Sequence, residues 1–313
     1  MPPTTQVQQH RAVREPLEQE RAVGNWRLVR LLGEGSWSQV YQAAPAPCTL
    51  STADYVLKIT RPEFAADPLA NDMLRREAQI GTTVEHPNLV SVLAARLDEP
   101  PSYIVMPYMI GVSLLEMLQT VGSLRTPHAL WIARQVASGL KQLHRTQWLH
   151  GDIKPANIFV ATSGHATLID FGMARRLPLS PSGNHHFAGT PDFAAPEWLS
   201  ASCTPGPCSD VYSLGLTLQQ MLTGAEPETR SRGKQPSSYR SQMPEAQTGA
   251  SCLPSNVARL LERVLNSDPA RRPTLDELIR IFVELEIETL SERLEAGFSE
   301  TRESNPATSL ERI

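Results

Sequence analysis

The spacing of apolar residues changes near Gly111, and this change constrains the fold more than any other feature of the chain. Before it, apolar residues fall in short runs typical of β-strands, with one helical stretch from Leu69 to Thr83. The runs are WRLVRLLG, SQVYQAA, DYVLKIT, VSVLAARL and SYIVMPY. After Gly111 they recur every three or four residues, as in amphipathic helices. The sequence therefore predicts an α+β chain with a small strand-rich lobe and a larger, mostly helical lobe.

The helical half contains three long segments with clear signals. One runs from Pro127 to Arg145, a second from Asp210 to Thr223, and a third from Leu275 to about Leu294. The apolar face of the first consists of Leu130, Ala133, Val136, Ala137, Leu140 and Leu143. Residues 224–255 are rich in Ser, Pro, Gly and charge, and they predict a long loop.

The two ends of the chain are polar and lack hydrophobic periodicity. We expect tails at residues 1–22 and 297–313, a first lobe with its hinge at 23–109, and a second lobe at 110–296. The chain has 313 residues, which is enough to bury a substantial core in such an arrangement.

Composition excludes several classes of function. A net charge of -4 gives no basic excess for binding nucleic acid or an anionic membrane. The four cysteines have no zinc-like spacing and predict free thiols in a reducing compartment. The N-terminus lacks an apolar signal core, and the run from Tyr103 to Leu115 is too short to span a bilayer. We expect a soluble, cytoplasmic chain.

One loop concentrates chemically active groups. The stretch LHGDIKPANIF places Asp152, Lys154 and Asn157 within six residues, and Asp170 follows the apolar strand ATLID. Phosphoryl transfer to a hydroxyl needs a carboxylate near the nucleophile, a cation near the γ-phosphoryl group, and oxygen ligands for Mg²⁺. These four residues supply one such set, although an Asx-rich turn is the plainer reading of any one of them.

Two further elements of the first lobe fit a phosphate site. LLGEGSWSQVY places Gly33 and Gly35 in a turn between two strands, where a missing Cβ lets backbone N–H groups approach phosphate oxygens. Taken alone, such a turn is more often only a tight hairpin. Lys58 lies on the YVLKI strand, and Glu77 on the following helix has a carboxylate able to hold its ammonium group.

In this order the motifs resemble those of the protein kinase superfamily, in particular its eukaryotic-like Ser/Thr branch that also occurs in bacteria. The resemblance covers roughly residues 24–290 through GEGSWSQV, VLKI, EHPNLV, HGDIKPAN, DFG, GTPDFAAPE and DVYSLG. It implies the bilobal kinase fold, with an antiparallel sheet and one main helix in the N-lobe. The activity that it implies is transfer of the γ-phosphoryl group of ATP with Mg²⁺, or alternatively Mn²⁺.

The resemblance also implies a role for each matching residue. Asp152 would orient the acceptor hydroxyl and Lys154 would steady the γ-phosphate, with Asn157 and Asp170 as metal ligands. The residues implied in ATP binding are Gly33, Glu34, Gly35, Ser36, Val40, Val56, Lys58, Glu77, Met106, Met109 and Phe159. Met106 would be the gatekeeper of a hinge at 106–109. Phe159 stands where the family more often has leucine, which predicts a tighter or flatter pocket floor.

Other positions bear on specificity and scaffold. Thr190 together with Lys154 matches the Ser/Thr-specific pattern, so serine or threonine acceptors in protein substrates are expected. Ala156 removes a carboxylate that some basic-directed relatives carry. Glu197 should pair with Arg272, and Asp210 should anchor the backbone of the catalytic loop. The sequence indicates neither substrate, nor upstream signal, nor oligomeric state.

Gly151 departs from the family pattern, in which regulated relatives have arginine beside the catalytic aspartate. That arginine pairs with a phosphate on the activation segment. Glycine cannot, so we expect activity that does not depend on phosphorylation of Ser180, Ser182 or Thr190. His185 and His186 resemble metal ligands, but adjacent histidines in a polar loop are more often solvated.

Two alternatives stay open. A pseudokinase or nucleotide-binding scaffold would dock partners without catalysis, although retention of Lys58, Asp152, Asn157 and Asp170 argues against it. A small-molecule kinase would share the lobes, but such relatives generally lack a segment like GTPDFAAPE.

Overall fold

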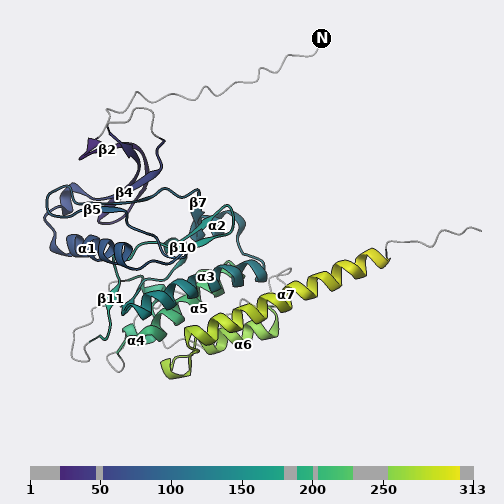
Figure 1. Ribbon diagram of the computed structural model, residues 1–313. Helices are drawn as coiled ribbons and strands as arrows, with labels where there is room; N and C mark the ends of the chain where they lie inside the picture. The colour runs from purple at the N-terminus through teal and green to yellow at the C-terminus, as the bar shows by residue number, and fades with distance from the viewer. Residues whose placement is uncertain (1–21, 47–51, 180–188, 200–203, 228–252, 304–313) are drawn as a thin grey trace, which may run out of the picture.

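The computed structural model describes residues 22–46, 52–179, 189–199, 204–227 and 253–303, with side chains described up to 289. Figure 1 shows a sheet with one helix stacked above a body of helices. The predicted two-lobed α+β architecture is therefore confirmed.

The upper lobe is built on an antiparallel sheet of six strands in the order β1-β2-β3-β4-β6-β5. Its strands are β1 Ala22–Val23, β2 Trp26–Glu34, β3 Ser38–Pro45, β4 Tyr55–Thr60, β5 Ala94–Arg96 and β6 Tyr103–Pro107. Helix α1 (Pro68–Thr83) begins at Asp67, whose side chain accepts a hydrogen bond from the Ala70 N–H at 2.9 Å. This helix carries Glu77 toward the lower lobe.

Strand β5 is shorter than the VSVLAARL run predicted. Val90 N–H donates to the Leu168 carbonyl at 3.0 Å, and Val92 N–H donates to the Gly81 carbonyl at 2.9 Å. Backbone groups at the start of the run thus bond to the lower lobe and to α1 instead of to a neighbouring strand, which explains why only three residues pair with β6.

The lower lobe is mostly helical, with α3 (Thr126–Arg145) buried at its centre. All six residues of its predicted apolar face are buried. The other helices are α2 Leu114–Val121, α4 Pro196–Leu199, α5 Pro207–Thr223, α6 Ser255–Val264 and α7 Leu275–Glu303. Short 3-10 turns occur at η1 Pro62–Phe64, η2 Pro155–Asn157, η3 Pro191–Phe193 and η5 Pro269–Arg271.

Two features of this lobe differ from the sequence prediction. Helix α6 was not predicted, because it follows directly on the Ser- and Pro-rich region. Helix α7 continues to Glu303, nine residues past Leu294, and projects away from the lobe in Figure 1. Gly297, three residues past Leu294, is a stop signal that the helix passes through, and no proline follows Leu294 until Pro306.

Short strands in the lower lobe position the loop 150–157. Strands β7 (Gly111–Ser113), β9 (Ile158–Ala161) and β10 (Ala166–Leu168) form a small sheet in the order β10-β9-β7. Strand β8 (Trp148–Leu149) pairs with β11 (Arg175–Arg176). The loop 150–157 and the segment 169–174 are therefore each fixed at both ends by a strand.

Several sequence predictions concern isolated features outside the site. Within the described ranges, no helix is long and apolar enough to cross a membrane. The same ranges hold no group of three or more His, Cys, Asp or Glu that could bind a metal. Ser180, Ser182, His185 and His186 lie outside the described residues.

Candidate active site

The loop 150–157 is anchored from below by Asp210 of α5. Its carboxylate accepts hydrogen bonds from the backbone N–H groups of His150 and Gly151, both at 2.9 Å. His144 Nε2 lies 2.8 Å from the same carboxylate. Burial opposes the charge of Asp210, but the hydrogen bond and the charge of His144 outweigh it and lower the pKa. The predicted anchoring role of Asp210 is confirmed.

Gly151 occupies a backbone conformation that favours glycine. Its φ is +76°, and a Cβ at this position would lie 3.1 Å from the carbonyl oxygen of Met173. The glycine noted in the sequence thus has a local backbone reason.

Asp152 lies at the centre of a hydrogen-bonded group. Its Oδ1 accepts from the Thr190 N–H at 2.8 Å, and its Oδ2 lies 2.8 Å from Lys154 Nζ and 2.9 Å from Asn157 Nδ2. Lys154 Nζ also donates to Thr190 Oγ1 at 2.6 Å. The structure therefore brings three loop residues together with the threonine of the GTP motif.

A second cluster of charged side chains joins residues of the two lobes. Lys58 Nζ from β4 lies 2.6 Å from Glu77 Oε2 and 3.0 Å from Asp170 Oδ1. Burial disfavours the Lys58 ammonium, but Asp170 and Glu77 outweigh burial and raise its pKa. Burial raises the pKa of Glu77 to about 7, because it exceeds the opposing effect of Lys58. Burial also acts against the charge of Asp170, yet Lys58 and the Gly172 N–H lower its pKa.

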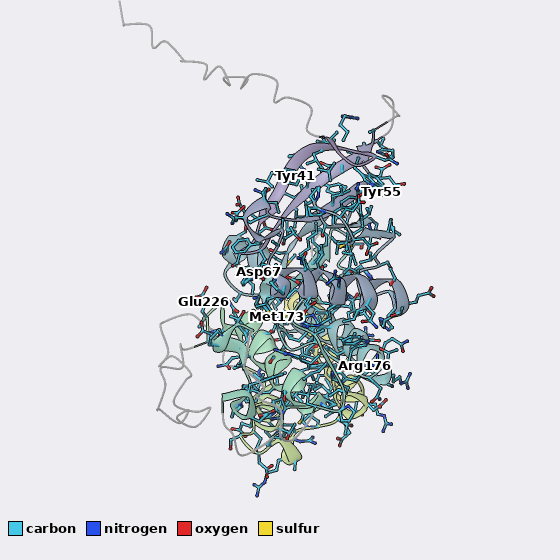
Figure 2. All side chains as sticks on the ribbon, turned by 90° about the vertical axis from the view of Figure 1, so that its left-hand side faces the viewer. Tyr41, Tyr55, Asp67, Met173, Arg176 and Glu226 are labelled. Atoms are coloured by element: carbon cyan, nitrogen blue, oxygen red, sulfur yellow. The ribbon has the colours of Figure 1, made fainter. Side chains whose placement is uncertain are left out.

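These two groups face each other across a cavity of about 260 Å³. Its walls come from the glycine turn, β4, α1, the loop 150–157 and the DFG segment. Of the predicted site residues, the cavity lining includes Gly35, Ser36, Lys58, Glu77, Asp152, Lys154 and Asp170. Met173, which also lines it, lies between the sheet bearing Tyr41 and Tyr55 and the helices below (Figure 2).

Five further residues implied in ATP binding are not among those that line this cavity: Val40, Val56, Met106, Met109 and Phe159. Val40 pairs with Lys58 across β3 and β4, and Val56 pairs with Met106 across β4 and β6. Paired residues share one face of a sheet, so these side chains lie on the same face as Lys58. Met109 packs against the main core, and the Phe159 ring lies 2.8 Å from where a Cβ on Gly111 would stand.

The glycine turn leaves room above the cavity. A Cβ on Gly33 would meet nothing within 4 Å, and one on Gly35 would come no closer than 3.6 Å to the Ser38 carbonyl oxygen. The turn closes through a 2.8 Å hydrogen bond from the Gly35 N–H to that oxygen. Glu34, the remaining predicted residue of the turn, is exposed and pairs with Arg61 at 3.2 Å.

Asp170 lines the cavity, and Asn157 lies next to Asp152 without being among the lining residues. The donor atoms of these two residues suit a hard divalent cation. Asp170 is 43% exposed, and Lys58 and Gly172 bond only its Oδ1, which leaves carboxylate oxygen accessible from the cavity. Asn157 uses its amide nitrogen twice, toward the carbonyl and the Oδ2 of Asp152, so its amide oxygen is the atom available to a metal. Carboxylate and amide oxygens are the ligands that Mg²⁺ prefers.

Sequence reasoning missed some contacts that hold the site. Arg76 Nη1 donates to the Gly172 carbonyl at 2.6 Å, and Asp152 N–H donates to His150 Nδ1 at 3.3 Å. Burial and the nearby charge of Arg175 lower the pKa of Arg76. Arg76 directly precedes Glu77, and this position was the sequence feature from which its role could have been predicted. His144 lies at the end of α3, six residues before His150, and its closeness to the loop could likewise have pointed to a role in holding the site.

The predicted pair of Glu197 and Arg272 is confirmed. Arg272 Nη1 and Nη2 donate to the two carboxylate oxygens at 2.6 and 2.9 Å, and both side chains are almost completely buried. Burial opposes ionisation of Glu197, but bonds from Arg272 and Ser209 outweigh it and lower the pKa. The pair connects the APE motif to the segment before α7.

The known proteins to which this chain is similar, and the family model that it matches, are protein kinases. A family model described as "Protein kinase domain" matches residues 26–281. The serine/threonine-protein kinase PrkC of Bacillus subtilis is 29% identical over 81% of this chain and 39% of its own length. PknK of Mycobacterium tuberculosis, also a serine/threonine-protein kinase, is 34% identical over 78% of this chain and 22% of its own. An "inactive serine/threonine-protein kinase", PLK5 of Mus musculus, is 29% identical over 82% and 42%. The chain thus spans less than half the length of these relatives.

Proposed function

Because the chain belongs to the protein kinase family, we propose that it transfers the γ-phosphoryl group of ATP to serine or threonine hydroxyls of protein substrates. The observation that carries the proposal is the cavity between two charge groups, one centred on Asp152 and one on Lys58. Phosphoryl transfer depends on positioning and on compensating phosphate charge, which such an arrangement supplies.

Each predicted residue then has a task that its contacts support. Asp152 would orient the acceptor hydroxyl and take up its proton, with Thr190 and Lys154 holding its carboxylate in place. Lys58, oriented by Glu77, would contact nucleotide phosphates beneath the glycine turn. Asn157 and Asp170 would hold Mg²⁺, or Mn²⁺ as an alternative, and a bound cation would offset charge on the phosphates.

We further propose that activity does not require phosphorylation of the activation segment. Three contacts between protein groups support this: Arg76 to the Gly172 carbonyl, Arg175 paired with Leu149 across β11 and β8, and Thr190 to Asp152. None of them needs a phosphate, and Gly151 has no side chain to bind one. Phosphatase-treated enzyme and a Ser180→Ala/Ser182→Ala variant should both keep the initial rate of wild type. A collapse of activity in both would refute this part of the proposal.

The assay for transferase activity uses MgATP, a generic protein substrate and phosphoamino acid analysis. Wild type should label serine or threonine, and Lys58→Met should not, because the phosphate contact is lost. The alternative is a pseudokinase or nucleotide-binding scaffold that docks partners without catalysis, and one relative is named an inactive kinase. Nucleotide binding without phosphate incorporation by wild type would favour that alternative.

A further inference from the structure

The glycine turn is contacted by residues that follow β4. Arg61 is the first residue after this strand, and the turn η1 places Phe64 three residues later. Arg61 contacts the turn at Glu34, Gly35 and Trp37, and Phe64 contacts it at Trp37. Trp37 lines the cavity, whereas Arg61 and Phe64 are not among the described residues that line it.

The guanidinium of Arg61 is aimed at the turn by its neighbour. Glu63 Oε1 accepts from Arg61 Nε at 2.8 Å and pairs with Nη2 at 2.5 Å. This leaves Nη1 facing the glycine turn, where it lies 3.2 Å from Glu34 Oε1 and 3.4 Å from the Gly35 carbonyl. Arginine suits this geometry because its planar fork presents several donors in fixed directions.

Two more contacts hold the tip of the turn. The Arg61 N–H donates to the Trp37 carbonyl at 3.0 Å. The Trp37 and Phe64 rings lie with centroids 4.9 Å apart, and the Arg61 guanidinium is 5.9 Å from the Phe64 ring centroid. Aromatic and cation–π contacts of this kind favour one arrangement of the rings.

We propose that Arg61 and Phe64 form a clamp of positioning residues that fixes the height of the glycine turn over the phosphate-binding cavity. This inference rests on the proposed function, since it assumes that MgATP occupies the cavity. The same short segment leads from the end of β4, which bears Lys58, into α1, which bears Glu77. The clamp therefore ties the cover of the cavity to the elements that hold its lysine.

We expect the ion pair of the clamp to contribute little to the stability of the fold. The Arg61 side chain is 29% exposed and that of Glu34 is 46% exposed, and exposed ion pairs contribute little to the free energy of unfolding. A contact that positions a phosphate cover should instead affect ligands that carry phosphates. Adenosine lacks phosphates, so its dissociation constant should not change.

The test measures dissociation constants for MgATP and for adenosine by calorimetry. For Arg61→Ala, the constant for MgATP should rise about three- to tenfold, while that for adenosine should stay within about twofold. Phe64→Leu should shift the MgATP constant in the same direction by a smaller factor, and Arg61→Lys should fall between wild type and alanine. The control is Arg96→Ala, which breaks an exposed ion pair with Glu99 at the opposite edge of the sheet and should change neither constant.

The outcomes separate this inference from the proposed function. If wild type binds MgATP, and both Arg61→Ala and Phe64→Leu leave the ratio of the two constants unchanged, the clamp is wrong and the proposed function stands. If both constants rise together in the folded variants, the residues act on the lobe as a whole and the clamp is again wrong. If wild type binds no MgATP, the proposed function itself fails.

Discussion

At the scale of single residues, backbone conformation matters as much as side-chain chemistry. Gly151 and Asp170 both have positive φ, at +76° and +68°. An L residue in this region costs about 1–2 kcal/mol, so it persists only where surrounding contacts hold it. Asp170 is held in this conformation by its ion pair with Lys58, whereas Gly151 has no Cβ, does not bear this cost, and donates one hydrogen bond to Asp210.

The first prediction concerns Gly151→Ala. The substitution should lower the free energy of unfolding by about 1–2 kcal/mol from the positive φ, with a further loss from the 3.1 Å contact with the Met173 carbonyl. Urea denaturation measures the change. Gly164→Ala is the control, because its φ is also positive, at +81°, and the nearest atom to its Cβ would be at 3.7 Å, an ordinary van der Waals distance. Equal losses in the two variants would contradict a role for the contact.

The second prediction follows from the raised pKa of Glu77. The unfolded carboxyl releases its proton near pH 4.5, whereas the folded one holds it to about pH 7. Folded protein therefore binds more protons in this interval, and this residue makes the free energy of unfolding fall as the pH rises. Glu77→Gln should remove that slope, a change on the order of 1–3 kcal/mol between pH 4.5 and 7.

Unfolding experiments across this pH range check the prediction. The exposed Glu99→Gln variant is the control, since its side chain is 73% exposed and not buried against Lys58. If the free energy of unfolding depends on pH in the same way for wild type and Glu77→Gln, a raised pKa at this position is contradicted.

Much of the site could be predicted at the scale of residues, but its hydrogen-bond network could not. Asp152, Lys154 and Asn157 are close in sequence, so their proximity in space follows directly. The bonds from Thr190 N–H to Asp152 and from Arg76 to the Gly172 carbonyl join residues 38 and 96 positions apart. Backbone partners leave no signature in the side-chain pattern, so only the folded structure identifies them.

At the scale of elements, periodicity predicted the helices that are buried and continuous. Helix α3 was predicted within one residue at its start, because its apolar face repeats for five turns. Strand β5 and helix α6 were predicted poorly. The first depends on bonds to α1 and β10, and the second follows a region whose composition indicates a loop.

The third prediction concerns the connection between elements made by Arg272. Arg272→Met should lower the free energy of unfolding by about 3–5 kcal/mol, since it leaves the buried Glu197 carboxylate without its ionic partner. Arg263→Met is the control. Its pair with Glu277 is half exposed and 3.8 Å long, and its loss should cost less than about 1 kcal/mol. If both variants lose a similar free energy of unfolding, the buried pair contributes no more to stability than the exposed one, and the prediction is contradicted.

At the scale of the whole molecule, function depends on two lobes that each contribute one half of the cavity. The sheet lobe supplies the glycine turn, Lys58 and Glu77, and the helical lobe supplies Asp152, Lys154 and Asp170. The order of motifs along the sequence predicted this division. It could not predict the height of the cover over the cavity, which depends on contacts of the glycine turn with Arg61 and Phe64.

The most direct test of the account compares wild type with Asp152→Asn at saturating MgATP. Because we propose that the Asp152 carboxylate takes up the acceptor proton, its removal should lower kcat for phosphorylation of a protein substrate by at least about a hundredfold. The dissociation constant for MgATP should stay close to that of wild type, because Lys58 and the glycine turn are unchanged. Equal phosphorylation rates for the two proteins would contradict phosphoryl transfer at this site.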